Sequence, residues 1–122
     1  MKKAIEATQK TFESSSSKTP EYIDWHRLFK REFRAFLNGI GAEEVVISRP
    51  HHFDMSGFFK KDGQCWYFRI ADLRWAKQNM LIRTAKSYQD YTGGVNQYVP
   101  LDKGEDAFSG SFKNAVGGSI QY

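Results

Sequence analysis

The sequence predicts an α+β fold in which one long amphipathic helix packs on a three- to four-stranded antiparallel sheet, with short helices at both ends. Two observations lead to this fold class. Residues 19–38 repeat large apolar side chains at the 3.6-residue period of a helix. Residues 43–87 contain β-branched and aromatic runs, parts of which alternate with polar residues, as strands do.

The first 18 residues are predicted to form an arm. Residues 2–13 suit a short helix, with Ile5 and Phe12 as its apolar anchors, and residues 14–18 read SSSSK, which is typical of a flexible linker. Because so short a helix is marginal when isolated, we expect the arm to be either mobile or docked onto a partner or a second copy of the chain. Residues 19–122 then form a single domain.

The long helix has recognisable ends. Thr19 can cap it, Pro20 suits its first position, and Gly39 or Gly41 ends it. Its apolar face is mainly aromatic and consists of Tyr22, Trp25, Phe29, Phe33, Phe36 and Leu37. A separate flank is basic and consists of Arg27, Lys30, Arg31 and Arg34. We expect the aromatic face to form the core rather than a ligand site.

Three or four strands follow the helix. Residues 43–50 are a β-branched run, residues 55–73 read as a hairpin around an Asp62-Gly63 turn, and residues 79–87 form another strand. Side chains alternate in the last two strands: Trp66, Phe68, Ile70, Met80, Ile82 and Thr84 on one side, and Cys65, Tyr67, Arg69, Leu81, Arg83 and Ala85 on the other. The helix is expected on the more apolar face, which leaves Tyr67, Arg69 and Arg83 on the opposite one. Residues 105–116 are predicted to form a short C-terminal helix.

Positive charge is concentrated in the central segment of the chain. The net charge is +4, and residues 45–86 contain eight basic and three acidic side chains, against ten basic and eleven acidic elsewhere. Such a local surplus favours an acidic partner such as nucleic acid, with an ordinary solvated surface as the alternative. No apolar run approaches the about 20 residues that cross a bilayer, and a single cysteine fits a reducing compartment. We therefore expect a cytoplasmic protein without a membrane partner.

The sequence lacks the motifs of common enzymes. The segment His51-His52-Phe53-Asp54 has metal-ligand types, but adjacent histidines on a strand point to opposite faces. It also lacks the His-hydrophobic-His order of rolling-circle nucleases, and neither GxGxxG nor GxxxxGK[ST] occurs. These patterns predict no metal, no cofactor and no catalytic residue. A small enzyme that uses Asp54 or Asp90 with a histidine stays open as an alternative.

A tyrosine- and glycine-rich loop follows the basic strand. Residues 87–100 read SYQDYTGGVNQYVP, in which Gly93-Gly94 permits positive φ and close backbone approach. Two interpretations remain open for this Tyr-Gly loop. It binds a ligand or partner, or it is a tight turn with tyrosines packed over the sheet edge.

Three segments within residues 52–99 resemble small uncharacterised accessory proteins of phages, plasmids and conjugative elements: HFDMSGFF, WYFRIADLR and MLIRTAKSYQDYTGGVNQYV. The resemblance implies a protein that handles DNA or RNA, or one that blocks a host defence complex such as a CRISPR effector. It supplies no catalytic residues.

Together these patterns predict a small non-enzymatic binding protein of a mobile genetic element. It is expected to contact nucleic acid or a nucleoprotein through the basic, aromatic-bearing sheet face and the Tyr-Gly loop. The residues expected to make contact are Tyr67, Arg69, Arg83, Lys86, Tyr88, Tyr91 and Asn96. The alternative is an anti-CRISPR-like inhibitor that binds a host protein through the same face or the arm. Both interpretations allow a homodimer, because the Ser-rich hinge lets the arm reach a second copy.

Overall fold

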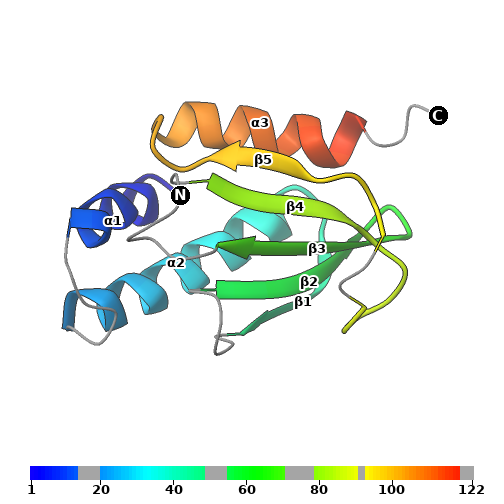
Figure 1. Cartoon of the computed structure of the whole chain (residues 1–122), viewed down its shortest axis with the longest axis horizontal. Coiled ribbons are helices and arrows are strands. Elements are labelled where there is room, and N and C mark those ends of the chain that lie inside the picture. Colours follow the sequence, from blue (N-terminus) through cyan, green and yellow to red (C-terminus); the bar gives the residue numbers. More distant parts are fainter. Residues whose placement is uncertain (14–19, 49–54, 71–78, 91–92, 119–122) are drawn as a thin grey trace.

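The computed structural model describes residues 1–13, 20–48, 55–70, 79–90 and 93–118. Within them the chain forms three helices and five strands, an α+β fold (Figure 1). In chain order these are α1 (Lys2–Glu13), α2 (Pro20–Gly39), β1 (Glu43–Ser48), β2 (Met55–Lys61), β3 (Gln64–Ile70), β4 (Asn79–Ala85), β5 (Gln97–Pro100) and α3 (Glu105–Gly118). None of these helices is long and apolar enough to cross a membrane.

The five strands pair in chain order, each antiparallel to the next, with β1 at one edge of the sheet and β5 at the other. The β2–β3 hairpin turns at Asp62 and Gly63, which have φ angles of 52° and 78°. Positive φ at both central residues belongs to the two-residue turn whose twist matches that of a hairpin. The predicted Asp-Gly hairpin is confirmed.

Alternation along β3 and β4 gives the sheet two unlike faces. Phe68 and Ile82 lie opposite each other on the inner face, which packs against the helices. Tyr67 and Arg83 lie opposite each other on the other side, which we call the outer face. The predicted division of the two strands into an apolar and a mixed side is confirmed.

Phe33 of α2 lies at the centre of the main core. Its ring centroid is 5.0 Å from that of Phe68 on the sheet and 5.5 Å from that of Phe112 on α3, both nearly edge to face. Most of the predicted aromatic face of α2 is buried with it, namely Tyr22, Trp25, Phe29 and Leu37. Burying one phenylalanine contributes about 1.5–3 kcal/mol. The helix therefore sits on the inner face chiefly through aromatic packing.

Helix α1 packs against α2 of the same chain. Ala4 and Ile5 belong to the main core, and Trp25 Nε1 donates a 2.6 Å hydrogen bond to Thr8 Oγ1. The N-terminal ammonium lies 3.7 Å from a carboxylate oxygen of Glu32. The helix predicted at residues 2–13 is thus present. The Ser-rich linker lies outside the described residues, and the division of the chain into an arm and a domain stays a prediction.

The sheet is wider than predicted. The sequence indicates three or four strands, whereas the structure has five, and β5 is the strand that is not predicted. It has only four residues and ends in Pro100, so it shows little of the usual strand pattern. It forms because β4 offers an open edge, where Met80 pairs with Val99. Gln97 Nε2 then fastens it to α3 by donating to Ala115 O at 3.3 Å.

Candidate functional site

The outer face brings together the two arginines expected there. Arg69 lies opposite Leu81, and Arg83 lies opposite Tyr67, in the β3–β4 ladder. The arginines are therefore diagonal neighbours on adjacent strands, close enough for long side chains to act on one ligand. The expectation that both project from the same face is confirmed.

Arg83 is held in place by two neighbours. Its guanidinium carbon lies 5.1 Å from the ring centroid of Tyr67, and its Nη1 donates a 3.2 Å hydrogen bond to Asn96 Oδ1. Arg83 Nε is buried, and no hydrogen-bond acceptor for it is found among the described residues. Within the same part of the chain no carboxylate forms an ion pair with Arg83. Two of the expected contact residues, Arg83 and Asn96, are thus joined directly.

Tyr67 lies on the expected face but is covered. Only 1 % of its surface is exposed, because Arg83 lies over its ring and Phe58 packs beside it with the centroids 5.2 Å apart. Tyr67 and Phe58 belong to a second, smaller apolar cluster, together with Cys65, Leu81 and Ala85. Tyr67, one of the residues expected to make contact, therefore has its ring covered in this structure.

Tyr88 covers the same cluster from the segment after β4. Its ring stacks on Phe58 with centroids 5.3 Å apart, and its hydroxyl donates a hydrogen bond to the carbonyl of Glu44. Lys60 Nζ lies 5.8 Å from the ring centroid. Burial, with smaller contributions from the charges of Cys65 and Glu44, raises the pKa of Tyr88 to about 12. The phenol is the donor of this hydrogen bond, and these contacts hold the segment after β4 against the cluster.

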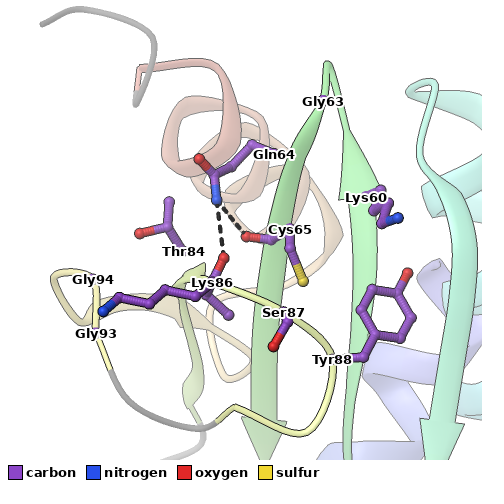
Figure 2. Close-up of a pocket in the computed structure, with 11 residues that line it drawn as sticks. Lys60, Gly63, Gln64, Cys65, Thr84, Lys86, Ser87, Tyr88, Gly93 and Gly94 are labelled. Carbon is purple, nitrogen blue, oxygen red and sulfur yellow. Dashed lines mark hydrogen bonds between the residues drawn. The ribbon is translucent and has the colours of Figure 1, made fainter.

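A hollow of about 920 Å³ opens beside Tyr88 (Figure 2). Lys60 and Tyr88 lie on one side of it, and Lys86, Gly93 and Gly94 on the other. The remaining lining consists of Gly63, Gln64, Cys65, Thr84, Ala85 and Ser87, so no carboxylate is among the lining residues that the structure describes. Lys60 is compensated by an ion pair with Glu44 at 2.8 Å. Lys86 is exposed, and it forms no ion pair with another described residue, so it is the uncompensated cation of this hollow.

The second glycine of the Gly-Gly pair, Gly94, lies in close contact with the backbone of β4. Gly94 has a φ of 71°, and a Cβ atom built there would lie 2.4 Å from the carbonyl oxygen of Thr84 on β4. Only glycine permits so close an approach without a shift of backbone. Of the two interpretations of the Tyr-Gly loop, this contact favours the turn at Gly94. Tyr91 lies outside the described residues.

Tyr98 is an outer-face aromatic that the sequence does not single out. It lies opposite Leu81 on β5, so Arg69, Leu81 and Tyr98 form one row across three strands. Its side chain is 61 % exposed. The residue belongs to the tyrosine-rich stretch, but without β5 it cannot be assigned to a face. Among the described residues, Tyr98 rather than Tyr67 is exposed beside the arginines.

The described residues contain no group of three or more His, Cys, Asp and Glu side chains that could hold a metal ion. Burial raises the pKa of the Cys65 thiol, which favours its unreactive protonated form. The N–H of Asp90 donates to Ser87 O in a turn, at 3.2 Å. His51, His52 and Asp54 lie outside the described residues, so the alternative of a small enzyme stays a prediction.

Comparison with protein-family models, with curated proteins and with solved structures found no significant match to this chain. The resemblance to accessory proteins of mobile elements therefore stays a prediction, as does the cytoplasmic localisation.

Proposed function

We propose that the outer face binds single-stranded nucleic acid. Arg83 and Lys86 contact phosphates, with Arg69 alongside, and Tyr98 stacks on an unpaired base. Proteins that hold single strands without sequence preference combine a basic surface with exposed aromatic rings. The outer face has both features, on neighbouring strands whose spacing the ladder fixes.

The proposal depends most on Arg83 and Tyr98, which lie near each other on the outer face. Arg83 has no carboxylate partner among the described residues, and Tyr67 and Asn96 hold its guanidinium in a set direction. Tyr98 is highly exposed for a tyrosine on a strand, and it lies one row from Arg83. A preorganised cation beside a free ring suits a ligand in which charged and planar groups repeat.

The experiment is an anisotropy titration of labelled oligo-dT and oligo-rU at two salt concentrations. Arg83→Met removes the charge but keeps an apolar cover over Tyr67, and we expect it to reduce the salt slope by about 0.7, the value for one phosphate contact. Tyr98→Ala should weaken binding by about 1–3 kcal/mol, the value of one stacked base.

Lys113→Met, on the exposed side of α3, is the matched control for loss of one charge. The proposal requires that the control bind as the wild type does. It is wrong if Arg83→Met and Tyr98→Ala match the control, or if the wild-type chain binds neither oligonucleotide. The second result would favour a protein partner.

A further inference from the structure

A second basic surface lies on α2, beside the β1 edge of the sheet. Arg27, Lys30, Arg31 and Arg34, which we call the basic flank, line an open groove of about 490 Å³ together with Ala35 and Asn38. Because a helix turns once every 3.6 residues, these positions form a stripe on a different side of α2 from the buried aromatic face that meets the inner face of the sheet. The flank and the outer face are therefore separate surfaces.

The charge of the flank is not compensated within the described residues. Glu32 stands among the four basic residues in the sequence, but it turns towards α1, where its Oε1 accepts the N–H of Ala4 at 3.0 Å and lies near the N-terminal ammonium. Asp24, one turn before the flank, forms no ion pair with a described residue. Arg34 is anchored by donating from Nη1 to the carbonyl of Val45 at 2.9 Å. The flank thus presents a fixed guanidinium beside three further cations.

The composition of the groove favours phosphate over an acidic protein. Hot spots of protein interfaces are aromatic or Arg anchors in well-packed, desolvated pockets, whereas this groove is open and its apolar residue is Ala35. Three of the four cations are arginines, whose fork of donors suits phosphate. From Arg27 to Arg34 the stripe rises about 10 Å, a length over which one strand of a duplex presents about three phosphates.

The same lining favours a duplex over a single strand. Single-strand sites use aromatic rings on which bases stack, and no aromatic side chain lines this groove among the described residues. A duplex keeps its bases inside and presents phosphates alone. We propose that the basic flank binds the sugar-phosphate backbone of a double-stranded nucleic acid. This site does not depend on the function proposed for the outer face.

The test uses a labelled, mixed-sequence DNA duplex and the full chain, with titrations at two salt concentrations. Arg27→Glu/Arg31→Glu changes two exposed side chains, and Lys103→Glu/Lys113→Glu makes the same change of charge at two other exposed positions. We expect the flank variant to lose at least about tenfold in affinity and about 1.8 in salt slope, which corresponds to two phosphate contacts. The control should keep most of both. A thermal melt checks folding, and Arg27→Gln/Arg31→Gln replaces the flank variant if that variant unfolds.

Equal losses in the flank variant and the control would overturn the proposal, because net charge alone would then explain binding. It would also be overturned if the wild type failed to bind the duplex. Titration with polyglutamate gives a further outcome: if the flank variant loses polyglutamate binding but keeps the duplex, the surface is one for acidic protein. Arg83→Met/Tyr98→Ala separates the two proposals, because it should leave duplex affinity unchanged.

Discussion

The surroundings of Arg83 show how a buried residue can support a proposed binding surface without contacting a ligand. Tyr67, which is buried, lies beneath the Arg83 guanidinium, and Asn96 accepts one of the guanidinium N–H groups. A cation–π contact contributes about 0.5–1 kcal/mol at partly exposed sites, and neither neighbour carries a negative charge. The arginine is therefore ordered but not neutralised. An ordered side chain loses less conformational entropy when a ligand binds, which makes Tyr67 a supporting residue.

Tyr88 gives a prediction at high pH. Its pKa is raised from 10.0 to about 12, first by burial and then by the charges of Cys65 and Glu44. A group whose pKa is higher in the folded state holds its proton there after the unfolded chain has lost it. The stabilisation is therefore complete below pH 10 and is lost as the pH rises towards 12. Denaturant unfolding measured across this range should show a steeper loss for the wild type than for Tyr88→Phe.

The comparison with Tyr88→Phe is informative because other groups also titrate in this range. Lys60, whose pKa is raised by its hydrogen bond to Glu44, is present in both proteins. Its effect therefore cancels in the difference. Parallel stability profiles from pH 10 to 12 would show that the Tyr88 phenol is solvated, and that the segment after β4 does not cover Phe58 in solution.

Helix α1 is joined to α2 by a polar contact inside an apolar interface. Trp25 Nε1 donates to Thr8 Oγ1, and Thr8 Oγ1 donates in turn to Ala4 O at 2.8 Å. Both side chains are buried, so neither can replace this partner with water. A buried donor without an acceptor is costly. The short chain of hydrogen bonds therefore fixes where α1 sits along α2.

Thr8→Val tests this docking. The substitution keeps the shape of the side chain but leaves Trp25 Nε1 without its acceptor, so we expect the free energy of unfolding to fall by about 1–3 kcal/mol. Urea unfolding measures the change. In a Trp25→Phe background the same substitution should cost much less, because the donor is absent. A loss near zero in the wild-type background would show that α1 is a mobile arm in solution.

The elements that the sequence predicts well are those whose pattern repeats. Helix α2 presents a large apolar side chain at nearly every turn, and β3 and β4 alternate over six or more residues. Strand β5 has four residues, one of them Pro100, and depends on the open edge of β4 and on the bond from Gln97 to α3. Both supports come from elsewhere in the chain, so no local pattern indicates this strand.

The sequence predicts the face of the sheet on which the site residues lie, but not which of their side chains are exposed. A strand period of two places Arg69 and Arg83 on one face, and the ladder agrees. Whether a side chain on that face is free depends on its neighbours across the sheet. Tyr67 is covered by residues of β2 and β4, and Tyr98 is exposed because it lies on an edge strand. Such relations require the strand order, which the sequence leaves open.

The whole molecule presents cations on two separate surfaces, the outer face of the sheet and the basic flank of α2. Figure 1 shows α2 lying across the sheet. If both proposals hold, one chain binds a single strand and a duplex at the same time. Sedimentation of a labelled oligo-dT with a differently labelled duplex should then show both in one complex with the protein. Arg27→Glu/Arg31→Glu should release only the duplex, and Arg83→Met/Tyr98→Ala only the single strand. Displacement of one nucleic acid by the other would instead mean that they share one surface.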